Sequence, residues 1–171
     1  MPYFAWLASS GPVSFSRVWA DGGYYSRIFL NVKGREPEGV IEPADYEPLR
    51  DELIAKLEAL GDEEGRSIGT RVFRPEDLYH EVNNVAPDLI AYFGNLAWRA
   101  IGSVGDRRVH VRENDTGPDD ANHAKFGIAV FAGPGMPAAV PADARLFDIA
   151  PTVLTALGLP VPADMQGRSL V

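Results

Sequence analysis

The sequence contains no cysteine, which excludes disulfide bonds, thiolate zinc sites and a thiol nucleophile. It holds only three histidines, so few nitrogen ligands are present for a transition metal. No apolar run approaches the roughly 20 residues that a helix needs to cross a bilayer. Residues 1–13 lack the positively charged start of a signal peptide. We therefore expect a cytoplasmic protein without a membrane span.

Positive charge is also scarce. The 16 Lys and Arg residues stand against 24 Asp and Glu residues, and the formal net charge is -8. No basic patch interrupts this excess, so binding to nucleic acid or to an anionic membrane is not expected. If the ligand is a phosphate, a bound metal ion must supply the positive charge near it.

Apolar patterns predict strands that alternate with helices, which is typical of an α/β layer architecture. Residues 24–32 are rich in aromatic and β-branched side chains, as in a strand. Residues 87–94 and 126–133 are short apolar runs that end in glycine, and they suit strands buried on both faces. Helical spacing predicts one helix within 42–61 and another that starts at Asp148.

The stretch richest in side chains suited to metal binding or catalysis is residues 113–125, ENDTGPDDANHAK, directly before the last predicted strand. It gathers three carboxylates and an imidazole in one loop: Asp115, Asp119, Asp120 and His123. Sites in open α/β sheets collect at strand ends, and this ligand set matches zinc or manganese. An ordinary solvated turn has the same composition. Calcium is disfavoured because the spacing does not match an EF-hand.

Longer patterns resemble enzymes of the alkaline phosphatase superfamily. Residues 122–137, NHAKFGIAVFAGPGMP, resemble the segment that supplies their last metal-binding histidine. The tail, residues 147–170, FDIAPTVLTALGLPVPADMQGRSL, is similar to the C-terminal helix and Met-x-Gly-Arg or Met-x-Gly-Lys ending of many sulfatases, phosphomutases and phosphodiesterases. Residues 23–39 and 114–123 resemble the branch of type I phosphodiesterase/nucleotide pyrophosphatase-like proteins.

The resemblance implies a single α/β domain over residues 14–171, after a poorly matched lead-in at residues 1–13. It implies part of an alkaline-phosphatase-like sandwich with a central, mostly parallel sheet flanked by helices, and with the N-terminal half of the fold missing. It also implies a metal-dependent phosphohydrolase or phosphodiesterase. His123 would be a metal ligand, zinc or manganese the cofactor, and a phosphate ester or nucleotide-like molecule the substrate.

Most of the implied active site has no counterpart in the sequence. Family members carry the nucleophile and the other metal ligands upstream, including an Asp-His-Gly element that is absent here. One imidazole does not hold a catalytic zinc, which usually keeps three protein ligands. We therefore expect a truncated, catalytically incomplete chain that binds metal weakly or not at all. The alternative is a non-catalytic binding or oligomerisation module, because a truncated sheet exposes an edge that favours homo-oligomers.

The other members of the acidic loop have several interpretations. Asp115, Asp119 and Asp120 either supplement His123, shape a substrate pocket or solvate the loop. Thr116 lies beside them, and it is a weak candidate for a nucleophile because no base or metal is evident next to it.

Arg35 and the two remaining histidines are candidates of a different kind. The forked guanidinium of Arg35 suits bidentate phosphate binding, and an ion pair with Glu36 or Glu38 is equally consistent with the sequence. His80 follows an amphipathic turn and is interpreted as a surface or packing residue. His110 lies in an alternating, strand-like run and is expected to face solvent.

Overall fold

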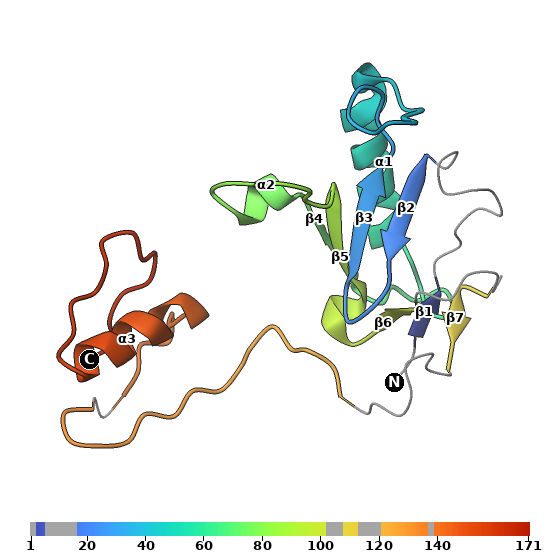
Figure 1. Ribbon diagram of the computed structural model, residues 1–171. Helices are drawn as coiled ribbons and strands as arrows, with labels where there is room; N and C mark the ends of the chain where they lie inside the picture. Colours follow the sequence, from blue (N-terminus) through green and yellow to red (C-terminus); the bar gives the residue numbers. More distant parts are fainter. Residues whose placement is uncertain (1–2, 6–16, 102–107, 113–120, 137–138) are drawn as a thin grey trace. The chain divides into compact units, whose positions relative to one another are not determined.

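The structure, a computed structural model, describes residues 3–5, 17–101, 108–112, 121–136 and 139–171 (Figure 1). The chain divides into two compact units, Met1–Phe126 and Gly127–Val171. Within the described residues, no helix has the length and apolar character needed to cross a lipid bilayer.

The first unit is built on a four-stranded antiparallel sheet with the order β2-β3-β5-β4. Its strands are β2 (Val18–Asp21), β3 (Ser26–Leu30), β5 (Leu89–Tyr92) and β4 (Arg71–Phe73). Residues 22–25, which include Gly22 and Gly23, join β2 to β3, and these two strands pair antiparallel. Strands β3 and β5 lie inside the apolar runs 24–32 and 87–94, and both strand predictions are confirmed.

The predicted central, mostly parallel sheet flanked by helices is wrong. Helix α1 (Tyr46–Glu58) lies in the connection between β3 and β4, and a strand-helix-strand order predicts parallel neighbours. Both strands instead pair antiparallel with β5, which lies between them. Strands β3 and β4 therefore run in the same direction without being neighbours. The order of elements along the chain does not reveal that a later strand enters between two earlier ones.

A second sheet of three short strands has the order β6-β1-β7. Strand β1 (Tyr3–Ala5) pairs parallel with β6 (Arg99–Ile101) and antiparallel with β7 (His110–Val111). A bridge between Gly23 and Ala100 joins the β2–β3 turn to β6, with backbone hydrogen bonds of 2.8 and 2.9 Å. The two sheets are therefore linked through the backbone at this turn.

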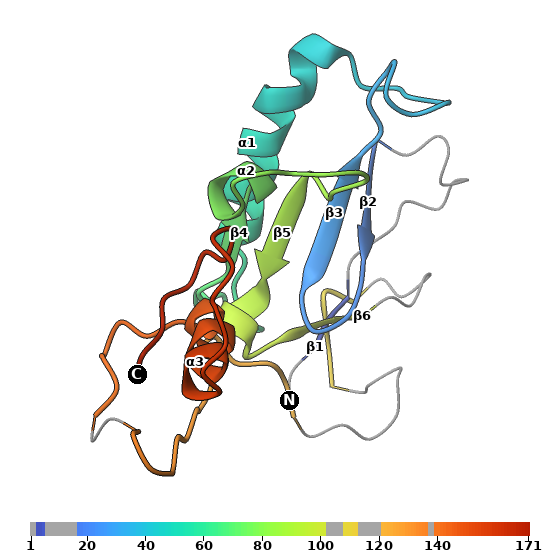
Figure 2. The same ribbon diagram turned by 60° about the vertical axis from the view of Figure 1, so that its left-hand side comes forward.

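Helix α1 covers one face of the four-stranded sheet (Figure 2). Its entry is a 3-10 turn, Pro43–Asp45, and Pro48 lies in its first turn, where a missing N–H costs little. The helix predicted within residues 42–61 is confirmed, and it ends at Glu58, before Gly61. Leu49 and Leu57 of α1 pack into the core with buried residues of the sheet and its connections: Ile28, Leu30, Val32, Ile41, Leu89, Ala91, Phe93 and Ala100.

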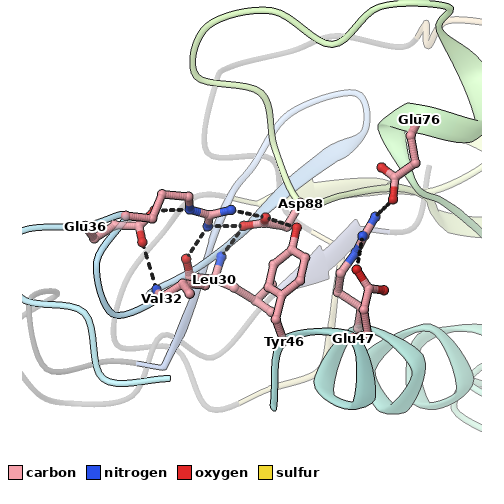
Figure 3. A network of polar contacts seen from close by, with 9 residues as sticks. Leu30, Val32, Glu36, Tyr46, Glu47, Glu76 and Asp88 are labelled. Atoms are coloured by element: carbon pink, nitrogen blue, oxygen red, sulfur yellow. Dashed lines mark hydrogen bonds and ion pairs between the residues drawn. The ribbon is translucent and has the colours of Figure 1, made fainter. Parts of the chain in front are cut away.

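A buried carboxylate, Asp88, joins the sheet, a loop and the helix (Figure 3). Only 2% of its side chain is exposed. It accepts hydrogen bonds from the backbone N–H of Leu30 at 2.6 Å, from the phenol of Tyr46 at 2.6 Å, and from both terminal nitrogens of Arg35 at 2.6 and 2.8 Å. Burial of a carboxylate is costly unless it is paired and hydrogen-bonded, and here both oxygens have partners.

The partners of Asp88 are held in their protonated forms. Hydrogen bonds to Asp88 raise the pKa of Arg35 above its ordinary value. Burial, followed by the hydrogen bond to Asp88, raises the pKa of Tyr46 to about 12. Both groups therefore remain hydrogen-bond donors to the carboxylate throughout the physiological pH range.

A second charged contact connects α1 to α2 (Pro75–Leu78). The Arg50 side chain is 3% exposed, and its guanidinium pairs with Glu47 on α1 at 2.9 Å and with Glu76 on α2 at 2.5 Å. The same guanidinium lies over the Tyr46 ring, 5.1 Å from its centroid. Tyr46 thus contacts two charged groups: its hydroxyl binds the Asp88 carboxylate, and its ring lies against the Arg50 guanidinium.

The predicted strand at residues 126–133 is wrong. These residues form irregular chain, and no described strand pairs with them. Phe126, Ile128 and Val130 are 83%, 94% and 83% exposed. The apolar run predicts a strand buried within a sheet, but neither sheet of the described residues includes it.

The second unit contains α3 (Ile149–Ala156), which follows a 3-10 turn, Leu146–Asp148. This confirms the helix predicted from Asp148, with Pro151 in its first turn. The side chain of Asp148 makes no N-cap hydrogen bond to the helix, however. Its carboxylate binds other parts of the second unit.

Removal of the charge at Asp88 is expected to destabilise the first unit. We expect Asp88→Asn to lower the free energy of unfolding by about 1.5–3 kcal/mol, the range for hydrogen bonds to a charged group. Urea denaturation measures this loss. Asp51→Asn is the matched control, because Asp51 also pairs with an arginine but is 69% exposed, and little change is expected there. Equal losses in the two variants would contradict the role assigned to Asp88.

Candidate functional site

His123, the predicted metal ligand, is exposed and lies on a stretch without regular secondary structure. The residue before it fixes this point of the chain. The amide nitrogen of the Asn122 side chain donates to the carbonyl of Leu96 at 2.5 Å and to that of Trp98 at 3.5 Å. Its Oδ1 accepts the backbone N–H of His123 at 2.8 Å. Asn122 therefore holds His123 to the connection between β5 and β6.

The imidazole of His123 contacts the ring of Tyr24 edge to face. The two ring centroids are 4.4 Å apart and the planes meet at 89°. The guanidinium of Arg99 lies over the same tyrosine ring, 4.3 Å from its centroid. The bridge from Gly23 to Ala100 brings Tyr24 beside β6. Gly23 has a φ of +147°, which side-chain-bearing residues rarely adopt, so glycine suits this turn.

The other residues of the predicted loop site lie outside the described residues: Asp115, Thr116, Asp119 and Asp120. In the part of the chain that the structure describes, no group of three or more His, Cys, Asp and Glu side chains could hold a metal ion. Catalytic zinc usually takes three protein ligands. The described residues include one candidate ligand, His123, and by themselves they do not fit a complete zinc or manganese site. The roles predicted for the four loop residues stay predictions.

Arg35, the other predicted substrate contact, directs its guanidinium to the buried Asp88, while 44% of its side chain is exposed. Besides Asp88, it donates to the carbonyl of Leu30 at 2.6 Å and to Glu36 at 2.7 Å. The ion pair with Glu36 is one of the alternatives left open by the sequence, and it is present. Asp88 gave no sequence signal as a partner, because it lies 53 residues away. Phosphate binding by Arg35 stays a prediction, and it would compete with the buried carboxylate.

The remaining histidines lie elsewhere in the first unit. His80 is exposed, as predicted. His110 is half-buried, so the expectation that it faces solvent is wrong. Its Nε2 lies 2.8 Å from the carbonyl oxygen of Gly61, and its ring centroid is 5.4 Å from that of Trp98. The turn after α1 and the tryptophan cover the imidazole, which the alternating sequence pattern does not show.

Trp98 and His110 line an open cavity of about 540 Å³, which sequence analysis missed because its walls come from separate segments. Arg66 pairs with Asp62 at 2.8 Å, and Arg112 pairs with Glu63 at 3.0 Å. These paired charges nearly balance, and they select neither an anion nor a cation. The rest of the lining is Val111 and Glu64.

The tail pattern that resembles the superfamily has a structural explanation within the second unit. The Asp148 carboxylate accepts the backbone N–H groups of Arg168 at 2.9 Å and Arg145 at 2.8 Å, and these hydrogen bonds lower the pKa of Asp148. The Thr152 hydroxyl donates to the carbonyl of Asp148 at 2.6 Å and accepts the N–H of Leu170 at 3.0 Å. These hydrogen bonds attach the tail to the start of α3.

Gly167 completes this attachment, because the tail passes very close to another backbone segment. A Cβ at this position would lie 2.0 Å from the carbonyl oxygen of Phe147 and 2.8 Å from the nitrogen of Asp148. Hydrogen bonds to the backbone therefore explain Asp148 and Thr152, and the close approach of two backbone segments explains Gly167 of the Met-x-Gly-Arg ending. They do not identify a catalytic group.

No protein-family model, curated protein or solved structure matches the chain. The resemblance to the alkaline phosphatase superfamily therefore rests on the sequence patterns alone.

Substitution of Gly167 is expected to detach the tail from α3. In Gly167→Ala, we expect backbone amides of residues 145–171 to exchange with deuterium at least about tenfold faster, because the clash opens the hydrogen bonds to Asp148 and Thr152. Hydrogen exchange with mass spectrometry measures this. Gly127→Ala is the control, since its Cβ would meet nothing within 4 Å. Unchanged exchange in Gly167→Ala would rule out the close approach as the reason for the glycine.

Proposed function

We propose that this chain is part of a metal-dependent phosphoric ester hydrolase of the nucleotide pyrophosphatase-like kind, and that His123 is one of its metal ligands. The observation that supports the proposal best is the exposure of His123 together with the contacts that hold it. Its imidazole is exposed, Asn122 holds its backbone, and Tyr24 contacts its ring. An acidic loop precedes it directly in the sequence.

The substrate class follows from the sequence patterns, which point to phosphate esters or nucleotide-like molecules. A divalent cation would neutralise the charge of such a substrate and lower the pKa of a bound water. The net charge of -8 makes a cation necessary, because the protein itself repels anions. Further metal ligands and a nucleophile would have to come from residues other than those described. Because the sequence lacks the Asp-His-Gly element that members of the superfamily carry, we propose that the chain by itself is catalytically incomplete. The cysteine-free composition supports the cytoplasm as its compartment.

The ligand role of His123 is tested by a matched pair of variants. His123→Ala and His80→Ala each remove one exposed imidazole. We expect the weak zinc binding of the wild type, measured by competition with a chromogenic chelator in metal-free buffer, to be lost in His123→Ala and to remain unchanged in His80→Ala. Equal zinc affinity in the wild type and His123→Ala would remove the ligand role.

The same proteins test catalytic incompleteness. With added zinc or manganese, we expect hydrolysis of a chromogenic phosphodiester by the wild type to remain at the level of the metal alone. Turnover that disappears in His123→Ala would contradict incompleteness and would mean that the chain assembles a working site.

A second candidate function is a non-catalytic module that forms homo-oligomers, and the exposed apolar run favours it. Phe126, Ile128 and Val130 present large apolar side chains to solvent on a stretch without strand partners among the described residues. Exposed apolar surface of this kind favours association with another chain.

Oligomeric state separates this second function from the first. We expect a dimeric wild type in size-exclusion chromatography with light scattering, and a monomeric Ile128→Lys, because a charge at this position opposes burial. Val85→Lys is the control, since Val85 is 90% exposed, close to the 94% of Ile128, but lies outside the apolar run. A monomeric wild type would remove the oligomerisation function.

A further inference from the structure

We infer that the face of the four-stranded sheet opposite α1 is an interface at which a second copy of this chain binds. The inference rests on the second candidate function, because both require two copies to associate, and it assigns the association to a defined surface. It is independent of the metal-ligand role proposed for His123.

The sheet carries apolar side chains on both of its faces. Side chains alternate between the two faces along each strand, and the core beside α1 receives Ile28, Leu89 and Val72. The positions next to these point to the opposite face, and an antiparallel sheet that faces water there normally carries polar residues. Five large apolar residues occupy that face instead, outside the core cluster of the described residues: Trp19, Phe29, Phe73, Ile90 and Tyr92.

The aromatic rings of this face form two contacting groups. Trp19 stacks on Phe29, with ring centroids 5.5 Å apart and planes at 10°. Phe73 contacts Tyr92 at 5.3 Å between centroids, and Tyr25 contacts Tyr92 at 5.8 Å. Tyr25 is 42% exposed, and the other four rings are half-buried. Part of this aromatic surface therefore remains open to solvent.

The composition of the face fits a protein partner. Aromatic residues and arginine are enriched at protein interfaces, whereas lysine and glutamate are depleted. The charged strand residues on this face are Asp21, Arg27 and Arg71, and its strand positions include no lysine or glutamate. Asp21 pairs with Arg27, and the chain has a net charge of -8. The face therefore lacks the excess of positive charge that binding to nucleic acid requires.

The arrangement of charge points to a second copy as the partner. The strand order places β2 at one edge of the sheet and β4 at the other, so Asp21 and Arg71 lie at opposite edges of the same face. A twofold axis parallel to the strands sets two such faces together and lays β2 of each copy over β4 of the other. Asp21 of one copy then lies within reach of the long Arg71 side chain of the other. The face is thus complementary in charge to itself.

The size of the face sets the strength of the association. Its strands are only three to five residues long. A stable interface buries roughly 800 Å² on each partner, which is more than this face offers, so we expect a weak dimer that dissociates on dilution.

The experiment reverses the charges at the two edges, in Asp21→Arg, in Arg71→Asp and in the double variant. Within one copy the two positions are three strand spacings apart, about 14 Å, where salt screens most of their interaction. Coupling between them in a double-mutant cycle therefore reports a contact between copies. Analytical ultracentrifugation over a concentration series measures the dissociation constant of the dimer. Asp51→Arg and Arg66→Asp are the controls, because they make the same changes at positions 69% and 74% exposed and outside this face.

We expect each single reversal to raise the dissociation constant about tenfold, because two symmetry-related contacts become repulsive. We expect the double variant to return close to the wild-type value and both controls to match the wild type. Urea denaturation verifies that the variants are folded, as expected for substitutions at exposed positions.

The possible failures are distinguishable. A dimer that dissociates in Ile128→Lys but is unaffected by either charge reversal would overturn the inference and leave the second candidate function standing. A wild type that is monomeric at every concentration would overturn both, and another segment of this chain or a different protein would then be the occupant of the face. Losses in both single variants without recovery in the double variant would mean local disturbance of the strands, and this too would overturn the inference.

Discussion

The first unit depends on one buried charge. The Asp88 carboxylate directly precedes β5, and it binds the end of β3 through Leu30, the following loop through Arg35, and the start of α1 through Tyr46. Three elements that are separate in sequence meet at two oxygen atoms. An unpaired carboxylate in this place would cost several kcal/mol, on the order of the entire stability of a small domain, so the elements must assemble together.

The position of β5 in turn determines where the candidate site lies. After β5 the chain turns sharply through a 3-10 segment, Phe93–Leu96, in which Gly94, Asn95 and Leu96 all have positive φ. At Gly94 a Cβ would lie 2.4 Å from Cδ1 of Trp98, so the turn needs glycine for its close approach as well as for its φ. This turn presents the carbonyl groups that bind Asn122, and it leads into β6 with Arg99. The surroundings of His123 are therefore a consequence of the sheet.

The tail shows that a distinctive sequence pattern can reflect how a segment folds and need not mark a catalytic site. Asp148 and Thr152 each bind backbone groups of the tail, and Gly167 permits the close approach of two backbone segments. These three contacts require particular residue types without any catalytic role. The part of the resemblance that is most distinctive thus concerns how the second unit folds, and any chemistry depends on the less distinctive stretch around His123.

The sequence by itself determined the local elements whose causes are local. Apolar spacing and the placement of Pro43 and Pro48 predicted α1, apolar runs predicted β3 and β5, and Asp148 marked the start of α3. Only the tertiary structure decided which strands are neighbours, because strand pairing depends on partners distant in the chain.

The tertiary structure also decided that Arg35 binds Asp88 and that Tyr24 contacts His123. Both pairs are separated by long stretches of sequence, and no periodicity connects them. Hydrogen bonds and ring contacts form between groups that the folded backbone brings within a few ångströms, so a pattern read along the chain identifies the groups without identifying their partners.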